Sequence, residues 1–183
     1  SLLTANVCRS HRLVNRLTSR WDRHTFAVSK EAAQSVTGPA AQHVSVLTHG
    51  IPVVQVRSRL AERERMRAEL DIAPGTLLFG TVANFREQKD YPNLLHACAL
   101  LAERGTPVRL VAVGQGPLEG EVRALQHELG LDDSVTLLGY RADAVDVLAA
   151  CDAFVLGSKW EGLPVALMEA CALGLPAVLT AIR

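Results

Sequence analysis

Short apolar runs alternate with amphipathic stretches from about residue 80 onward. The apolar runs predict buried strands, and the amphipathic stretches predict helices that cover them. We expect strands at residues 77–83, 108–113, 135–138, 153–156 and 177–180, and helices at 91–104, 117–130, 142–150 and 163–173. Strands that alternate with helices predict an α/β fold, namely a Rossmann-like parallel sheet with flanking helices. Ligands of such sheets bind where strands pass into helices, so these connections form the expected functional edge.

The first 70 residues show a weaker pattern. Residues 25–28 predict a short strand, and Ser29 is a suitable N-cap for a helix at residues 30–35. The segment Thr48-His49-Gly50-Ile51, followed by Pro52, predicts a turn between domains. Residues 57–70 carry Arg and Glu at helical neighbour spacing, which predicts a solvated helix without any further role.

Composition narrows the class of protein. With 49% hydrophobic and 21% charged residues in 183, the chain is typical of a globular protein of one domain, or of a domain and a piece of another. A formal net charge of zero gives no reason to expect nucleic acid as a partner. Residues 1–30 are nevertheless basic, with one acid, Asp22, against Arg9, Arg12, Arg16, Arg20, Arg23 and Lys30. Both a solvated face and a helix on a membrane surface fit that excess.

The cysteines and the absence of a long apolar stretch bear on the compartment. The four cysteines are scattered and have no metal-ligand spacing to each other or to histidine, namely Cys8, Cys98, Cys151 and Cys171. They predict buried free thiols in a reducing compartment. No apolar stretch approaches the roughly 20 residues that a membrane span needs. We therefore expect a cytoplasmic protein, with the inner face of the membrane as an alternative place.

The run from Glu161 to Ala170 carries the clearest chemistry. Pro164 suits a first helical position, because its missing N–H needs no partner there. The backbone N–H groups of residues 162–166 would then face an anion such as a phosphate. Glu161 and Glu169 would offer carboxylates beside that anion, as the hydroxyls and the diphosphate of a nucleotide-sugar require. Spacing alone also fits a loop Glu and a helical Glu without a ligand.

A longer string decides between these alternatives. Glu161-Gly-Leu-Pro and Glu169-Ala, followed by Leu173-Gly174-Leu175-Pro176-Ala177-Val178, resemble the Glu-x7-Glu signature of the retaining family-4 glycosyltransferases. Similar segments recur in the family's order over the chain, at residues 26–33, 49–51, 80–89, 113–117 and 135–143. The resemblance implies the C-terminal half of a GT-B fold plus a remnant of its N-terminal domain. Residues 1–50 would be the tail end of the acceptor-side domain, and 51–183 the donor-binding domain, truncated at its C-terminus.

The resemblance also implies roles for individual residues. Glu169 would accept the ribose hydroxyls, and Glu161 would hold hydroxyls of the transferred sugar near the reacting carbon. Arg86 and Lys89 would stabilise the charge on the leaving diphosphate, which is usually the largest catalytic contribution. The other donor-binding residues lie on glycine-rich turns and at the motif helix, namely Gly114, Gly116, Gly139, Tyr140, Arg141, Gly162, Leu163 and Pro164. The family generally uses no metal, and we expect neither a metal nor a cofactor.

Several of these positions also have plain structural explanations. Arg86 and Lys89 beside Glu87 are also a common surface pattern, and Gly114-Gln115-Gly116 is also a simple tight turn. Asn84 fills the family's common Arg position, so either Arg86 would substitute from two residues further on, which we favour, or the phosphate would be held mainly by Lys89. Trp160 would shape the sugar pocket or merely pack.

The implied function is transfer of a sugar from a nucleoside-diphosphate sugar to an unknown acceptor, a carbohydrate or a lipid-linked one. The acceptor half of such an enzyme lies mostly outside this sequence, so we expect no turnover by residues 1–183 alone. Two alternatives stay open. One is a non-catalytic nucleotide-sugar binding module, and the other is a nucleotide-sugar epimerase of similar architecture, although epimerases lack the Glu-x7-Glu string.

Overall fold

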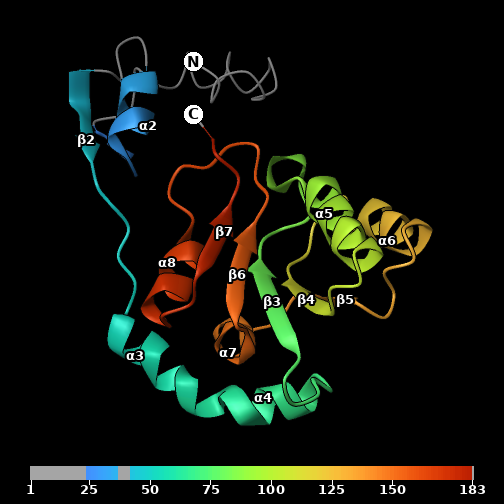
Figure 1. Ribbon diagram of the computed structural model, residues 1–183. Helices are drawn as coiled ribbons and strands as arrows, with labels where there is room; N and C mark the ends of the chain where they lie inside the picture. The colour runs from blue at the N-terminus through green and yellow to red at the C-terminus, as the bar shows by residue number, and fades with distance from the viewer. Residues whose placement is uncertain (1–23, 37–41, 183) are drawn as a thin grey trace. The chain divides into compact units, whose positions relative to one another are not determined.

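The computed structural model describes residues 24–36 and 42–182 of the chain. The chain divides into two compact units between Gly50 and Ile51 (Figure 1). Cys8 and the basic positions from Arg9 to Arg23 lie outside the described residues. The acceptor-side and donor-binding roles of the two units stay predictions.

The first unit contains a small parallel pair of strands. Strand β1 (Thr25–Ala27) pairs with β2 (Val44–Val46), and helix α2 (Lys30–Ser35) lies between them in the chain. The Ser29 hydroxyl accepts a hydrogen bond from the Ala32 N–H at 3.1 Å, so the predicted N-cap is confirmed. Strand β2 was not predicted.

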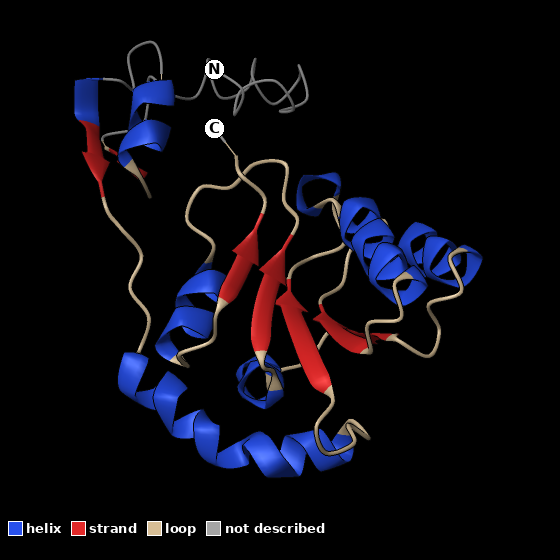
Figure 2. Ribbon diagram, viewed as in Figure 1, coloured by secondary structure: helices blue, strands red, loops and turns tan. Residues whose placement is uncertain are grey.

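The second unit is built on a five-stranded parallel sheet in the order β5-β4-β3-β6-β7 (Figure 2). The strands lie within a residue of their predicted bounds, at Leu77–Val82 (β3), Val108–Val113 (β4), Val135–Gly139 (β5), Ala153–Leu156 (β6) and Ala177–Leu179 (β7). The helices between them are Tyr91–Glu103 (α5), Glu119–Glu128 (α6), Ala144–Ala150 (α7) and Val165–Ala172 (α8). The predicted Rossmann-like α/β fold is thus confirmed.

The strand order changes direction between β3 and β6. From β3 the chain moves outward to β4 and β5, then returns to β6 on the other side of β3 and continues to β7. The arrows of β3, β6 and β7 point to the top of Figure 1, so their carboxyl ends share one edge. Ligands of open α/β sheets bind outside the carboxyl ends at such a switch point. The strand order therefore makes the loops that follow β3 and β6 the expected place for a ligand.

The predicted solvated helix at residues 57–70 is confirmed in part, because the segment is helical and mostly exposed but differs in its bounds and has side chains held by the rest of the unit. The segment forms α3 (Val53–Ser58), a 3-10 turn (η2, Arg59–Glu62) and α4 (Arg63–Glu69). Met66 is fully buried against the sheet's second core cluster. Arg59 pairs with Asp146 of α7, and Arg63 pairs with Asp152. These acids lie more than 80 positions away in the chain, so no local pattern could reveal them.

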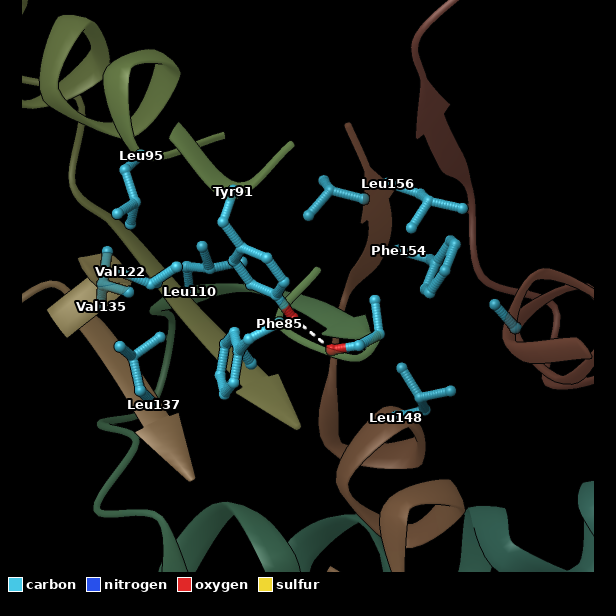
Figure 3. Close-up of a cluster of buried hydrophobic side chains, with 14 of the residues drawn as sticks. Phe85, Tyr91, Leu95, Leu110, Val122, Val135, Leu137, Leu148, Phe154 and Leu156 are labelled. Carbon is cyan, nitrogen blue, oxygen red and sulfur yellow. Dashed lines mark hydrogen bonds between the residues drawn. The ribbon is translucent and has the colours of Figure 1, made fainter. Parts of the chain in front are cut away.

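Two buried aromatic residues fix the loop after β3. Phe85 and Tyr91 are 0% and 3% exposed, and their ring centroids lie 4.6 Å apart. The Tyr91 hydroxyl donates to the Ala83 carbonyl at 2.6 Å, shown dashed in Figure 3, and burial raises the pKa of this phenol. Asn84 and Arg86 alternate with buried neighbours and are exposed. The loop is therefore anchored in the core while it presents polar side chains outward.

The cysteine prediction holds only in part. Cys151 is buried, Cys98 is half-buried, and Cys171 is exposed on α8. All three are free thiols. The expectation that each thiol is buried is wrong for Cys171, because α8 packs with one side only and turns this position outward. Within residues 24–36 and 42–182, every helix is too short or too polar to cross a bilayer.

Candidate functional site

The loops at the carboxyl edge of the sheet are tied together by backbone hydrogen bonds. The Gly114 N–H donates to the Gly139 carbonyl at 2.9 Å, and the Phe85 N–H donates to the Gln115 carbonyl at 3.2 Å. On the other side of the switch point, the Lys159 N–H donates to the Gln88 carbonyl at 2.8 Å. The loops after β3, β4, β5 and β6 thus form one connected rim. All the predicted site residues except Glu169, which lies within α8, belong to this rim.

Gly114 and Gly116 allow two of these loops to meet. A Cβ at Gly114 would lie 2.0 Å from the Ala83 carbonyl oxygen, and one at Gly116 would lie 2.4 Å from the Phe85 carbonyl oxygen. No side chain fits at either distance, because both obstacles are backbone atoms. The glycines therefore serve close packing between the loops after β3 and β4. Their predicted approach to a bound donor stays a prediction.

Lys89 and Glu161 meet directly across the switch point. Lys89 comes from the loop after β3, and Glu161 comes from the loop after β6. The Lys89 Nζ atom lies 2.5 Å from Glu161 Oε1, and the two side chains are 17% and 10% exposed. A largely buried carboxylate requires such a partner. The structure therefore brings together the two residues that the sequence assigned to the sugar and the diphosphate.

Glu161 has further donors that the sequence analysis missed. The Ser158 hydroxyl donates to Glu161 Oε1 at 2.6 Å, and the Gln88 amide donates to Oε2 at 3.4 Å. Ser158 is only 2% exposed, yet it is polar. A serine two residues after the apolar run of β6 is the sequence signal for it, since a buried hydroxyl needs a partner.

Arg86 and Asn84 lie on the same loop without side-chain partners. Among the described residues, neither side chain makes a hydrogen bond or an ion pair, and both are exposed. Arg86 lines a cleft of about 340 Å³ at the start of α5, together with Glu87, Asp90 and Lys159. The structure does not join Arg86 to the Lys89–Glu161 pair, so its phosphate role stays a prediction.

The motif helix begins at Val165, two residues after the predicted start of the helix at 163–173 and one residue after Pro164. Pro164 has extended backbone angles and is the N-cap, because its carbonyl accepts from the Leu167 N–H at 3.2 Å. The prediction of Pro164 as the first helical residue is therefore wrong. The N–H groups of Gly162 and Leu163 make no hydrogen bond within the described residues. These donors remain open at the helix start.

Glu169 stands inside α8, in contrast to Glu161. Its side chain is half-buried and has no hydrogen-bonding or ionic partner among residues 24–36 and 42–182. Burial alone raises the pKa of this carboxyl group. A carboxylate that loses water without gaining a donor is destabilising for the fold, and such groups are common in functional sites.

The two side chains after Gly139 differ in their freedom. Gly139 has a φ of +70° and turns the chain out of β5. Arg141 is held by Asp143 at 2.6 Å and by Glu69 of α4 at 2.7 Å. The hydrogen bonds with Asp143 and then with Glu69 raise the pKa of Arg141. Tyr140 is 70% exposed, so it is the freer of the two side chains for stacking on a base.

The part of the chain that the structure describes contains no evident metal-binding site. There, His, Cys, Asp and Glu side chains do not gather in groups of three or more that could hold an ion. The expectation that the protein uses neither a metal nor a cofactor stays a prediction.

Known proteins show which family this architecture represents. EpsF of Bacillus subtilis (strain 168), which carries the name of a glycosyltransferase, is 35% identical over 139 residues, or 76% of this chain and 36% of that protein. UDP-Gal:alpha-D-GlcNAc-diphosphoundecaprenol alpha-1,3-galactosyltransferase of Escherichia coli is 28% identical over 143 residues, or 76% of this chain and 37% of that protein. The chain thus spans about a third of the length of these relatives.

A solved structure shows the same fold. Anabaena Alr3699/HepE, in complex with UDP-glucose, superimposes with a TM-score of 0.79 at 22% identity, over 92% of this chain and 47% of that one. The model of the family described as "Glycosyl transferases group 1" matches residues 62–183, which contain the whole five-stranded sheet and its rim of loops. This chain therefore belongs to the glycosyl transferases group 1 family.

Proposed function

We propose that this chain is the donor-binding half of a retaining glycosyltransferase of family 4 that uses a nucleoside-diphosphate sugar. The observation that carries the proposal is the Lys89–Glu161 pair, which joins the loops after β3 and β6 across the topological switch point. In this proposal the Lys89 ammonium would bind phosphate and the Glu161 carboxylate would bind sugar hydroxyls, and the two groups form an ion pair with each other.

Within the chain, Lys89 and Glu161 satisfy each other's charge at 2.5 Å. A bound donor would replace both partners, because its phosphate oxygens accept from Lys89 and its sugar hydroxyls donate to Glu161. Arg86, exposed on the same anchored loop, would add a second cation to the diphosphate.

The remaining rim residues would bind the nucleoside. Glu169 would accept hydrogen bonds from the ribose hydroxyls, which would relieve its unpaired, half-buried carboxylate. The open N–H groups of Gly162 and Leu163 favour an anionic oxygen at the start of α8. The Gly139 turn would carry Tyr140 to the base, where its exposed ring can stack.

The reaction would transfer the sugar without a metal or a cofactor. The bond from the anomeric carbon to the diphosphate breaks, and its electron pair stays on the diphosphate. The acceptor oxygen bonds to the anomeric carbon on the same face, and its proton leaves with the nucleoside diphosphate. Lys89 and Arg86 would stabilise the charge that builds on the departing group, which is where electrostatic catalysis acts most strongly.

Relatives support the substrate classes. The HepE structure is described as a complex with UDP-glucose, which favours a uridine nucleotide as a probe. The Escherichia coli relative is named for transfer to a diphosphoundecaprenol-linked sugar. We therefore propose that the acceptor is a carbohydrate or a lipid-linked sugar and that the transfer takes place at the inner face of a membrane. We propose no nucleic-acid partner.

Titration calorimetry of residues 1–183 with UDP, UDP-glucose, UDP-galactose and GDP-glucose tests the proposal. We expect Lys89→Met to weaken binding of UDP and UDP-sugars alike, by about 10- to 100-fold, as expected for a lost charge-assisted hydrogen bond. Arg104→Met, an exposed arginine at the far end of α5, is the matched control and should change nothing. Binding of no nucleotide by the wild type, or equal binding by Lys89→Met, would contradict the proposal.

Retention requires a separate measurement. A transferase that contains this domain should give a product whose anomeric proton shows the same configuration by NMR as the sugar in the donor. An inverted product would contradict the mechanism, while nucleotide-sugar binding without any transfer would favour a non-catalytic module.

A further inference from the structure

We infer that Ser158 and Gln88 are positioning residues for Glu161, which keep its carboxylate aimed at the sugar after Lys89 turns to the diphosphate. This inference rests on the proposed function. It assigns specificity for the sugar moiety to two neutral side chains that do not themselves need to touch the donor.

Ser158 is built into the site rather than exposed on its surface. Its hydroxyl donates to Glu161 Oε1 at 2.6 Å, and the residue is only 2% exposed. The Thr180 hydroxyl, directly after β7, donates to the Ser158 carbonyl at 2.6 Å. Strands β6 and β7 are neighbours in the sheet, so this bond ties the loop after β6 to a second strand end. The serine is therefore held in place independently of Glu161.

Gln88 holds the same loop from the other side of the switch point. Its amide Nε2 donates to the Trp160 carbonyl at 2.9 Å and reaches Glu161 Oε2 at 3.4 Å. The backbone carbonyl of Gln88 accepts from the Lys159 N–H at 2.8 Å. These bonds pair residue 88 with three successive residues of the opposite loop. The two carboxylate oxygens of Glu161 thus have different neutral donors, which fixes the rotation of the group.

The two neutral donors matter because the Lys89 ammonium cannot bind the Glu161 carboxylate and a donor diphosphate equally well at the same time. Lys89 also donates to Oε1, the oxygen that Ser158 binds. A diphosphate carries more negative charge than one carboxylate, so it would draw the Lys89 ammonium toward itself. Glu161, 10% exposed, would then depend on Ser158 and Gln88 to keep its orientation. Neither neutral group is attracted to the diphosphate as an ammonium is.

The ratio of the dissociation constants for UDP-glucose and UDP isolates this role, because only the first ligand carries a sugar. We expect Ser158→Ala and Gln88→Met to raise that ratio about tenfold, the size of one hydrogen bond to a charged group, and Glu161→Gln to raise it at least as much. The affinity for UDP should stay within about twofold. Ser158→Thr, which keeps the hydroxyl, should restore the ratio toward the wild-type value.

The controls distinguish the positioning role of Ser158 and Gln88 from the proposed sugar-binding role of Glu161. Ser134→Ala, which removes a half-buried hydroxyl at the start of β5, should leave the ratio unchanged. If Glu161→Gln shifts the ratio but Ser158→Ala and Gln88→Met do not, the positioning role is overturned and the proposed function stands. If Glu161→Gln leaves the ratio unchanged, or the wild type binds neither ligand, the sugar role of Glu161 falls and this inference falls with it. Equal losses for UDP and UDP-glucose in Ser158→Ala would mean a merely structural role.

Discussion

The packing of the loops after β3 and β4 predicts a large effect for a single methyl group. In Gly114→Ala, the new Cβ would lie 2.0 Å from the Ala83 carbonyl oxygen, and the three atoms nearest to it are all backbone atoms. Backbone cannot rotate away, so the two loops must part by about 1 Å or more to reach ordinary contact distances.

The cost follows from what joins the loops. Three backbone hydrogen bonds cross between them, from the Ala83, Phe85 and Leu118 N–H groups at 2.9, 3.2 and 3.2 Å. Each such bond is worth about 1 kcal/mol net, and overpacking costs about 1–3 kcal/mol. We expect Gly114→Ala to lower the free energy of unfolding by about 3 kcal/mol. The displaced loop carries Lys89, so affinity for UDP should fall as well.

Urea unfolding followed by circular dichroism measures the first effect, and calorimetry with UDP measures the second. Gly120→Ala is the matched control, because no atom lies within 4 Å of the added Cβ and the glycine lies in α6. There, alanine should stabilise the helix by about 0.5–1 kcal/mol. If both alanines change stability by the same amount and sign, the close packing of the two loops is refuted.

Three further predictions address other parts of the unit. Arg59→Ala should lower the midpoint of urea unfolding, because it leaves the carboxylate of Asp146, 3% exposed, without its main partner; an unchanged midpoint would contradict this. Burial raises the pKa of Glu169, so the protonated form favours folding, and that contribution is lost as the pH rises from about 4 through the folded pKa. Glu169→Gln should therefore raise the melting temperature at about pH 7 but not at about pH 4, and equal shifts at both values would exclude the unpaired carboxylate. Iodoacetamide should modify Cys171 in the native chain but spare Cys151, whose pKa burial raises to about 12. Peptide mass spectrometry locates the modified thiols, and an unmodified Cys171 would contradict its exposure on α8.

Much of the sheet was predictable because inner strands such as β4 and β6 are largely buried. Ala153–Leu156 is a continuous apolar run, Val108–Val113 is apolar apart from Arg109, and the structure reproduces the predicted bounds of both. Helix ends were less predictable. The pattern of apolar positions continues into Pro117 and Leu118, whereas α6 begins at Glu119. Capping geometry, not apolar spacing, sets such ends.

The prediction failed where the partner lies far away in the chain. Residues 57–70 contain many charges and resemble a solvated helix, yet Arg59 and Arg63 reach acids on and after α7. A charged side chain shows its sign in the sequence but not its distance to a counter-ion. The bond from Ser158 to Glu161 spans only three residues, whereas the bond that ties the Ser158 carbonyl to Thr180 spans 22 and forms only because β6 and β7 are neighbours in the sheet.

For the candidate site, the sequence by itself determined which chemical groups are present and in what order. Local apolar runs and turn glycines specify strands and loops, because these depend on neighbours along the chain. Only the tertiary structure decided that Lys89 and Glu161, 72 positions apart, form a pair, and that Arg86 stands apart from it. The parallel sheet determines this, since its strand order brings the loops after β3 and β6 together at one edge. Distances between such loops depend on the packing of whole elements, and no short segment of sequence encodes them.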